Sequence, residues 1–279
     1  MTPCPAPLGA EITGLDVRGV LDRDNTYPVW QNILAAFAER KVLFFRDQEL
    51  TASDLVSFAA HFGPIGHYPF AEPLPDNPDV IAVIKEPDQT SNFGGMWHTD
   101  TPYLERPAAA TALYAVEVPD EGGDTIWSDM VAALDALPRA LVSELSALRA
   151  VQSAAKNKQA LRADPLHDGT MSGVHEEDMD TRQATHPVVR THPVTGEKTL
   201  FVSPAHTTNF AGLTEEASKP LLDELFAHAI QDQFCHRHHW TPGTLAIWDN
   251  RVSLHYPLND YHGHRREMLR VTIDGEVPV

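Results

Sequence analysis

The sequence predicts an α+β fold with a mainly β core of the β-sandwich or jelly-roll type, surrounded by helices. Many short apolar segments of strand length are separated by turn residues. Helical periodicity is confined to a few stretches, chiefly 25–40, 129–148 and 214–230. The chain has 279 residues, a usual size for one domain built on a barrel or sandwich. We therefore expect a single domain over residues 1–279.

The N-terminal part is predicted to contain two helices around a buried strand. Apolar residues recur at helical spacing between Asn25 and Arg40. The apolar run Lys41–Arg46 is expected to form the strand. Thr51 then caps a second helix, because Asp54 follows it by three residues, and Gly63 ends this helix.

Two more helices are expected further along the chain. One is predicted over Asp129–Leu148, capped by Ser128 and broken or kinked at Pro138. The other covers Thr214–Ile230, where Pro220 lies in the first turn or shortens the helix. The remaining core is predicted to be β-structure: Asp79–Lys85, Ala109–Val118, Asp124–Trp127, a hairpin of His186–His192 with Lys198–Ser203, Thr244–Trp248, Ser253–Tyr256 and Arg265–Asp274.

Residues 157–183 are polar and show no clear period. A long irregular stretch inside a compact domain is usually a functional lid or a mobile loop. We expect such a lid or mobile loop here, with a disordered surface loop as the alternative.

The charge balance narrows the class of partner. The chain carries 21 lysine and arginine residues against 39 aspartate and glutamate residues, a formal net charge of −18. Such a surface repels phosphate backbones and anionic lipids, so neither nucleic acid nor a membrane is expected as a partner. A small anionic substrate remains compatible, because a few arginines can reverse the field inside one pocket. The sequence leaves open whether the chain forms a homo-oligomer.

Two further features concern the compartment. Cys4 and Cys235 are too few for a disulfide framework, and we expect free thiols in a reducing compartment. The first residues lack a basic region followed by an apolar run, so no signal peptide is expected. No apolar stretch reaches membrane-spanning length. We therefore expect a cytoplasmic protein.

The segment Met96–Asp100 contains a candidate metal site. In an extended segment, residues two apart point to the same face, so His98 and Asp100 would converge. His255 is the best candidate for a third ligand. Two histidines and one carboxylate leave three positions open on an octahedral ion, which is typical of iron(II) oxygenases. A structural zinc site would be closed and would usually contain cysteine.

A His-x-Asp pattern alone is weak evidence in a chain with 15 histidines. The segment Cys235–His239 is denser in ligand types, but we expect ordinary strand and surface histidines there. His262 and His264 lie in a glycine-containing turn and are weaker candidates still. The metal site therefore depends on the residues that accompany it.

An arginine pair follows His255. In a strand, Arg266 and Arg270 share one face. Two arginines on an inward face are costly unless each meets an anion, and the guanidinium group matches a carboxylate in two-point contact. Surface ion pairs with Glu267 or nearby acids are the alternative. The position of Arg266 and Arg270 after a candidate metal histidine favours anion binding.

With these residues, the sequence resembles the taurine dioxygenase family. This iron- and 2-oxoglutarate-dependent group also includes 2,4-dichlorophenoxyacetate dioxygenases. The resemblance runs over nearly the whole chain and implies a double-stranded β-helix core (jelly roll, cupin-like). It rests on several blocks in order: Leu8–Asp16, Val42–Gln48, Trp97–Asp100, Gly122–Trp127, His186–Pro193 and Ala246–Arg270.

The resemblance implies roles for five residues of the metal and co-substrate sites. His98, Asp100 and His255 match the iron ligands at the catalytic centre. Arg266 and Thr125 match the residues that hold the distal carboxylate of 2-oxoglutarate. The implied cofactors are Fe(II), the co-substrate 2-oxoglutarate and O2.

The resemblance also implies a substrate site. Arg270 matches an arginine that holds the substrate anion in sulfonate-using members, and His67 matches a histidine of that pocket. Taurine-specific members have tyrosine where this chain has Phe70, and asparagine where it has Gly94. Both differences remove polar groups, so a larger or more apolar acid than taurine is expected.

The implied function is hydroxylation of a small to medium organic acid by a 2-oxoglutarate-dependent dioxygenase. The acid is a sulfonate, a sulfate ester, or an aryloxy or other carboxylate, and hydroxylation can be followed by loss of the substituent on the hydroxylated carbon. Two alternatives are a cupin-like metal-dependent hydrolase or isomerase, and a non-catalytic protein that binds small anions. The hydrolase or isomerase would use the same three ligands but has no need for Arg266 and Thr125.

Overall fold

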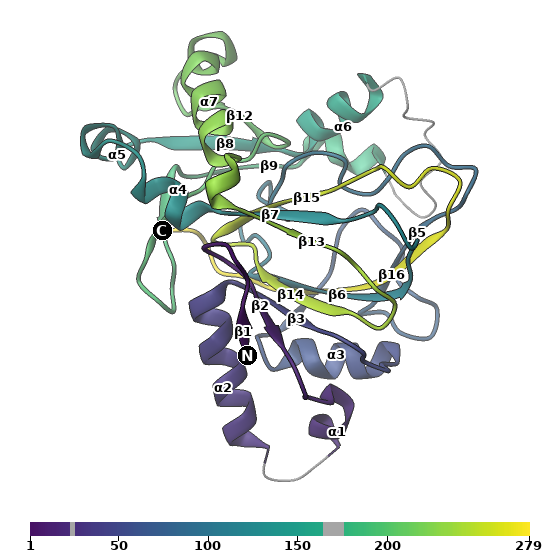
Figure 1. Ribbon diagram of the computed structural model, residues 1–279. Helices are drawn as coiled ribbons and strands as arrows, with labels where there is room; N and C mark the ends of the chain where they lie inside the picture. Colours follow the sequence, from purple (N-terminus) through teal and green to yellow (C-terminus); the bar gives the residue numbers. More distant parts are fainter. Residues whose placement is uncertain (23–25, 164–175) are drawn as a thin grey trace.

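The computed structural model describes residues 1–22, 26–163 and 176–279. It has a mixed α and β architecture with a strand-rich core (Figure 1). The described residues form an eight-stranded main sheet in the order β1-β2-β3-β14-β6-β16-β4, with β5 paired to β16. Its strands are β1 (Thr2–Pro3), β2 (Ala10–Ile12), β3 (Val42–Phe45), β4 (Ile65–Gly66), β5 (Ile81–Lys85), β6 (Ala110–Glu117), β14 (Leu245–Asp249) and β16 (Arg266–Ile273).

A smaller sheet packs against one face of the main sheet. It has the order β13-β7-β15, formed by β7 (Thr125–Asp129), β13 (Cys235–His238) and β15 (Ser253–Pro257). Figure 1 shows these strands above the main sheet. The core between the two sheets is rich in aromatic residues and contains Leu8, Val42, Phe44, Ala115, Trp127, Trp240, Ala246, Trp248 and Met268.

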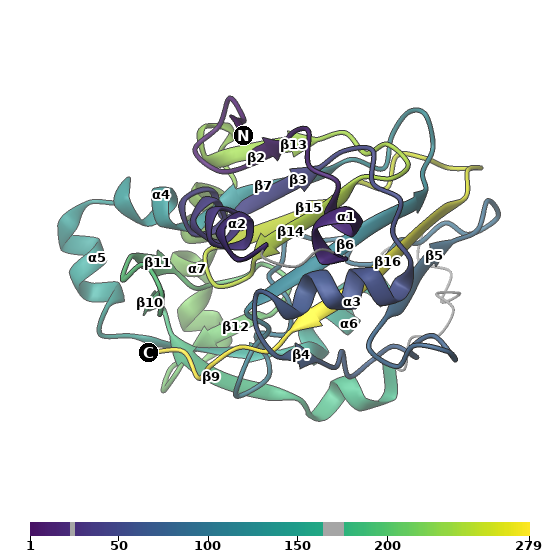
Figure 2. The same cartoon turned by 90° about the horizontal axis from the view of Figure 1, so that it is seen from below.

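Helices cover the other face of the main sheet, as Figure 2 shows for α2 and α3. α1 (Val17–Leu21), α2 (Tyr27–Arg40) and α3 (Ala52–Ala60) lie on this side. Strand β3 explains the two layers: Leu43 and Phe45 join the helix-covered core, whereas Val42 and Phe44 face the smaller sheet. All four side chains are completely buried, as expected for the apolar run of this strand.

A peripheral unit completes the fold. It contains the sheet β12-β8-β9, with β8 (Arg149–Ser153), β9 (Gln183–Pro187) and β12 (Thr207–Phe210), and the hairpin of β10 (Val189–Thr191) with β11 (Lys198–Leu200). Its helices are α4 (Met130–Asp135), α5 (Arg139–Leu145), α6 (Ala154–Ala163) and α7 (Glu215–Ala229), and short 3-10 helices lie at Glu176–Thr181 and Asp232–Phe234.

Most predicted strands and the helix at Thr51 are confirmed, but His186–His192 is divided between β9 and β10, and the helix ends at Ala60, before Gly63. Thr51 and Asp54 form a reciprocal capping box, in which each side chain accepts a hydrogen bond from the other residue's backbone N–H. The hairpin predicted between His186 and Ser203 is the β10–β11 pair. Helix α2 begins at Tyr27 and buries Trp30, Ile33 and Phe37 against the sheet.

The helix predicted over 129–148 is broken at Pro138, as expected, into α4 and α5. Its predicted cap needs correction. Asp129, not Ser128, caps α4, since its carboxylate accepts from the backbone N–H groups of Val131 and Ala132. Ser128 is still inside β7, where its hydroxyl donates to the backbone of Ala229.

Two other expectations differ from the structure. Pro220 lies inside α7, beyond the first turn, and the helix still continues to Ala229. The segment 157–183 is regular at both ends, where it overlaps α6 and the 3-10 helix Glu176–Thr181. Residues 164–175 lie outside the described residues, so the lid remains a prediction. In the described part of the chain, no helix is both long and apolar enough to cross a membrane.

Candidate metal centre and adjoining cavities

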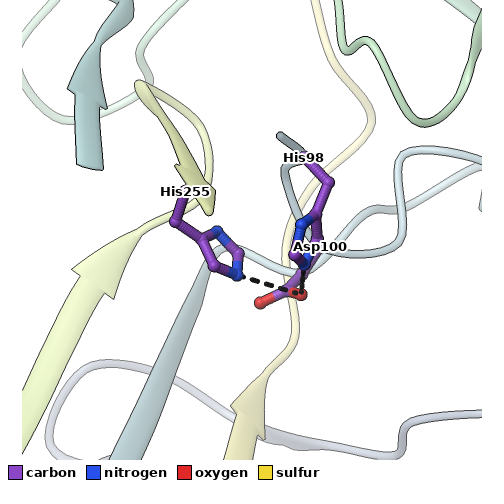
Figure 3. A group of neighbouring side chains, drawn as sticks. All are labelled: His98, Asp100 and His255. Carbon is purple, nitrogen blue, oxygen red and sulfur yellow. Dashed lines mark ion pairs between the residues drawn. The ribbon is translucent and has the colours of Figure 1, made fainter. Parts of the chain in front are cut away.

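The backbones of His98 and His255 pair directly. His98 lies in an extended segment and His255 in β15, and they form an isolated antiparallel bridge. The His98 N–H donates to the His255 carbonyl at 2.9 Å, and the His255 N–H donates to the His98 carbonyl at 2.7 Å. Asp100 follows two residues after His98, so its side chain points to the same place. The bridge brings together the three residues that were predicted as metal ligands (Figure 3).

The three side chains converge on one point. Nε2 of His98 lies 3.8 Å from Oδ1 of Asp100, and Nε2 of His255 lies 3.9 Å from the same oxygen. One ligand atom from each residue lies within 4.8 Å of the others, and all three residues are buried. Among the described residues, this is the group of histidines, cysteines and carboxylates close enough to hold a metal ion.

The protonation states suit a divalent cation. Nδ1 of His98 lies 2.7 Å from the Met96 carbonyl, which can only accept, so Nδ1 carries the proton and Nε2 has a free lone pair. Burial lowers the pKa of both His98 and His255, which favours neutral imidazoles. Burial alone would raise the pKa of Asp100, but Arg270 and the two histidines outweigh it and lower that pKa. Two neutral imidazoles and one carboxylate therefore fit Fe(II), with coordination positions left for other ligands.

Hydrogen bonds behind the triad hold Asp100 in place. Thr111 Oγ1 donates to Asp100 Oδ2 at 2.6 Å, and Nδ2 of Asn250 donates to Thr111 Oγ1 at 2.9 Å. Oδ1 of Asn250 accepts from the Trp248 indole at 2.9 Å. The remaining carboxylate oxygen of Asp100, Oδ1, faces the two histidines. Sequence reasoning missed Thr111 and Asn250, because Thr111 lies 11 positions from Asp100 in a different segment and Asn250 lies 139 positions from Thr111, so neither contact leaves a local signal.

A cavity beside His255 contains both residues predicted to bind 2-oxoglutarate. Thr125 and Arg266 line it together with Trp127, Trp248 and Arg270. Three buried donors here have no hydrogen-bond partner among the described residues: Nε of Arg266, Nε of Arg270 and Nε1 of Trp127. Buried guanidinium groups without acceptors are costly, so the cavity fits an anionic ligand.

The arginine pair lies as predicted on one buried face of β16. Arg266 and Arg270 are 7% and 4% exposed. The alternative of surface ion pairs with Glu267 applies to their neighbour Arg265, whose Nη1 lies 2.7 Å from Glu267 and 2.6 Å from Glu117. No described carboxylate forms an ion pair with Arg266.

Arg270 lies between the metal ligands and a second cavity. Its Nη2 is 3.0 Å from Asp100 Oδ1. Its guanidinium carbon lies 4.8 Å from the centroid of the Tyr68 ring and 5.5 Å from that of Phe93. Both contacts are within the range of cation–π attraction. The cation is therefore placed where an acid bound beside the triad could meet it.

The second cavity opens on His98 and Asp100 and has a largely aromatic wall. Of the predicted substrate residues, Phe70 and Gly94 line it. His67 is exposed and is not among the described lining residues, whereas its neighbours Tyr68 and Phe70 line the cavity. Sequence reasoning missed the other members of the described wall: Tyr68, Phe93, Thr101, Tyr103, Ala154, Asn157, Met179 and His206.

Gly94 is required by the position of a metal ligand. Its φ is +76°, in the left-handed region that favours glycine. A Cβ at this position would lie 2.6 Å from Cε1 and 3.1 Å from Nε2 of the His98 ring. Any side chain at Gly94 must therefore displace either the local backbone or the His98 imidazole.

The other histidine clusters play no part in this centre. His236 and His238 lie in β13, as expected for ordinary strand residues. The His238 ring is buried and stacks on Phe44 at 3.8 Å between centroids. His262 and His264 are exposed.

Comparisons with known proteins agree with this geometry. The family model described as "Taurine catabolism dioxygenase TauD, TfdA family" matches residues 1–272. An alpha-ketoglutarate-dependent 2,4-dichlorophenoxyacetate dioxygenase of Cupriavidus pinatubonensis is 37% identical over 84% of this chain and 84% of its own. An alpha-ketoglutarate-dependent sulfate ester dioxygenase of Pseudomonas putida is 32% identical over 99% of this chain and 90% of its own. The solved structure of AAD-2 in complex with Mn(II) and N-oxalylglycine superimposes with a TM-score of 0.80, at 27% identity, covering 99% of this chain and 97% of that one.

These matches exclude the hydrolase, isomerase and non-catalytic alternatives, because the family and its named relatives are dioxygenases. The buried triad supplies the metal ligands that such chemistry needs. The chain therefore belongs to the TauD/TfdA family of dioxygenases, oxidoreductases that depend on Fe(II), 2-oxoglutarate and O2.

Proposed function

We propose that this enzyme hydroxylates an organic acid with an apolar, ring-sized body, such as an aryloxy or aryl carboxylate or an aromatic sulfonate or sulfate ester. One observation supports this most directly: the cavity beside His98 and Asp100 is walled by four aromatic rings, Tyr68, Phe70, Phe93 and Tyr103. The rings contact one another in the order Phe93, Tyr68, Phe70, Tyr103. Neighbouring ring centroids lie 5.3 to 5.8 Å apart, and the contacts are edge-on or tilted. Such a wall favours apolar surface over a small zwitterion.

The assignment of roles follows from the two cavities. His98, Asp100 and His255 would hold Fe(II), and Arg266 with Thr125 would bind the distal carboxylate of 2-oxoglutarate. With its co-substrate and O2, the iron supplies the oxidising power that converts a substrate C–H bond to C–OH, while 2-oxoglutarate becomes succinate and CO2. The protein's own residues hold the two acids in adjacent cavities and exclude water from the reacting carbon.

Arg270 is proposed to attract the substrate anion. It reaches the triad on one side and lies against Tyr68 and Phe93 of the aromatic wall on the other. An acid held there places the carbons next to its acidic group closest to the metal. When the hydroxylated carbon also bears an ether oxygen or a sulfonate, the product is unstable and the substituent leaves.

We also propose a double-stranded β-helix fold and a cytoplasmic location. The two packed, mainly antiparallel sheets, with the triad between the smaller sheet and an extended segment, support a double-stranded β-helix core. Cys4 and Cys235 are both free, which supports the expected reducing compartment, the cytoplasm.

The test is a panel of acids assayed for succinate release with Fe(II) and 2-oxoglutarate. We expect aryloxy carboxylates or aromatic sulfonates to stimulate turnover well above the substrate-free rate, and taurine to stimulate it little.

Phe70→Ala should raise KM for the best aromatic acid about tenfold, because it removes buried apolar contact, and should leave KM for 2-oxoglutarate unchanged. Tyr27→Ala, at an exposed position far from the cavity, is the control. Equal stimulation by taurine and the aromatic acids would overturn the proposed substrate class.

A further inference from the structure

Trp240 contacts both residues proposed to bind the distal carboxylate of 2-oxoglutarate. Its indole Nε1 donates a hydrogen bond to Thr125 Oγ1 at 2.9 Å. Its ring centroid lies 5.9 Å from the guanidinium carbon of Arg266, within the range of cation–π attraction. Trp240 is 1% exposed and is not among the described residues that line the cavity. It therefore stands behind Thr125 and Arg266.

The hydrogen bond from Trp240 determines what the Thr125 hydroxyl can do. An indole N–H can only donate, so Thr125 Oγ1 accepts this bond with one of its lone pairs. The hydroxyl's own hydrogen then has to be donated elsewhere, and no described residue accepts it. The remaining direction is the cavity that Thr125 lines. Accepting one hydrogen bond also polarises the hydroxyl and strengthens the one that it donates.

The fold fixes Trp240 in this place. Strand β13 pairs with β7 so that His238 lies opposite Thr125, and Trp240 follows two residues later. The Asp124 carboxylate accepts from Arg237 Nε at 2.7 Å and from His239 Nδ1 at 2.9 Å. These bonds hold the chain on both sides of His238. The Trp240 ring then packs in the core between the sheets, 6.2 Å from that of Trp127.

We propose that Trp240 is a positioning residue of the co-substrate site, which orients the Thr125 hydroxyl toward the distal carboxylate and supports the Arg266 guanidinium from behind. This inference rests on the proposed roles of Thr125 and Arg266. Trp240 itself touches neither the metal nor the bound acid. Its effect should therefore appear in the affinity for 2-oxoglutarate and not in the binding of groups that lack a distal carboxylate.

The experiment measures binding to the Mn(II)-loaded protein by calorimetry, in the wild type and in Trp240→Phe. Phenylalanine keeps an aromatic ring in the core but removes the N–H. We expect Kd for 2-oxoglutarate to rise about three- to tenfold, the range for one lost hydrogen bond. Pyruvate has the same 2-oxo acid head and no distal carboxylate, so its Kd should be unchanged. An equal loss of affinity for 2-oxoglutarate and pyruvate would mean that the variant only loosens the site, and would overturn the proposal.

A double-mutant cycle with Thr125→Val separates positioning from packing. Once the hydroxyl is absent, Trp240→Phe should have a much smaller effect on Kd for 2-oxoglutarate, because only its contact with Arg266 remains to be weakened. The same fold-change in both backgrounds would contradict the proposal, even if Trp240→Phe alone lowers stability. Trp30→Phe, in the core under α2, is the matched control for losing a buried indole and should not change either Kd.

Arg266→Lys distinguishes this inference from the proposed function. It should raise Kd for 2-oxoglutarate at least tenfold, because an ammonium cannot form the two-point contact with a carboxylate. If Arg266→Lys weakens the binding of 2-oxoglutarate and Trp240→Phe does not, the assigned co-substrate site is supported and the proposed role of Trp240 is wrong. If Arg266→Lys has no effect, the assigned co-substrate site is itself wrong.

Discussion

His98 and His255 exchange two backbone hydrogen bonds, at 2.9 and 2.7 Å, so that two metal ligands far apart in sequence form one β-bridge. The bridge belongs to the backbone and does not depend on either imidazole. Loss of one ring should therefore remove a metal ligand without separating the two segments.

The first prediction concerns His255→Ala. We expect the variant to fold with an unchanged circular dichroism spectrum but to lose metal binding, because two ligands remain where three are needed. Mn(II) at one hundred times its wild-type Kd should stabilise the wild type by about 2.7 kcal/mol and leave the variant unaffected. Thermal unfolding with and without Mn(II) measures this. The exposed His262→Ala is the control, and a full metal-dependent shift in His255→Ala would argue against the triad.

A second prediction uses two glycines with similar backbone angles. Gly94 has a φ of +76° and Gly212 a φ of +86°, but a Cβ at Gly212 would meet nothing within 4 Å. Alanine at either position should lower the free energy of unfolding by roughly 1 kcal/mol for backbone strain. Only Gly94→Ala should also weaken Mn(II) binding, at least tenfold, because its methyl group displaces the His98 ring. Equal metal affinities in the two variants would count against this view of Gly94.

The hydrogen bond behind Asp100 gives a third prediction. Thr111→Val removes the 2.6 Å bond to Asp100 Oδ2 and should weaken metal binding about 10- to 100-fold, as is usual for such supporting contacts. Thr207→Val is the matched control, because Thr207 is also buried and donates to Oε1 of Gln152 at 2.9 Å in the peripheral sheet, away from the metal ligands. Both variants should lose about 1 kcal/mol of stability. Metal titrations should separate them, and a parallel loss of affinity would contradict the role of Thr111.

The fourth prediction concerns stability against pH. Burial, with smaller contributions from Arg46, His236 and His239, lowers the pKa of His238 to about 2. The native state therefore keeps this imidazole neutral, whereas the unfolded chain takes up a proton below its ordinary pKa of about 6.5. The contribution of His238 to stability is present above pH 6.5 and decreases as the pH falls from there toward 2.

Between pH 7.5 and 5.0, His238 should thus account for about 2 kcal/mol of the stability lost by the metal-free enzyme. Denaturant unfolding of His238→Gln at both pH values should show a pH-dependent loss smaller by that amount. The same substitution at exposed His262 is the control. An unchanged pH dependence in His238→Gln would mean that this group is protonated in the folded state as well.

The sequence predicted the triad because two of its members lie two residues apart in an extended segment, where spacing alone places them on one face. His255 and the cavity arginines also lie on strands, where the same alternation holds. His67, which the resemblance assigns to the substrate pocket, is exposed and is not among the described lining residues, whereas Tyr68 and Phe70 are, so its role stays a prediction. A family match transfers a position in the chain, but the direction of its side chain depends on the local backbone.

The parts that could not be predicted depend on contacts between distant segments. The bond from Trp240 to Thr125 spans 115 positions, and that from Thr111 to Asp100 joins a strand to a loop whose path over the sheet no local pattern reveals. The prediction of the α4 cap was wrong for a different reason. Ser128 and Asp129 are both good caps in isolation, and only the length of β7 decides that Asp129 is the residue at the boundary.

The distribution of indoles gives the enzyme its own optical reporter. Of its five tryptophans, Trp127 and Trp248 line the co-substrate cavity, Trp240 lies directly behind it, and Trp97 precedes a metal ligand. Only Trp30 lies in the helix-covered core on the far side of the main sheet. The intrinsic emission of the unlabelled protein should therefore respond when 2-oxoglutarate enters the Mn(II)-loaded site. The Trp30→Phe protein should show the same response against a lower constant background.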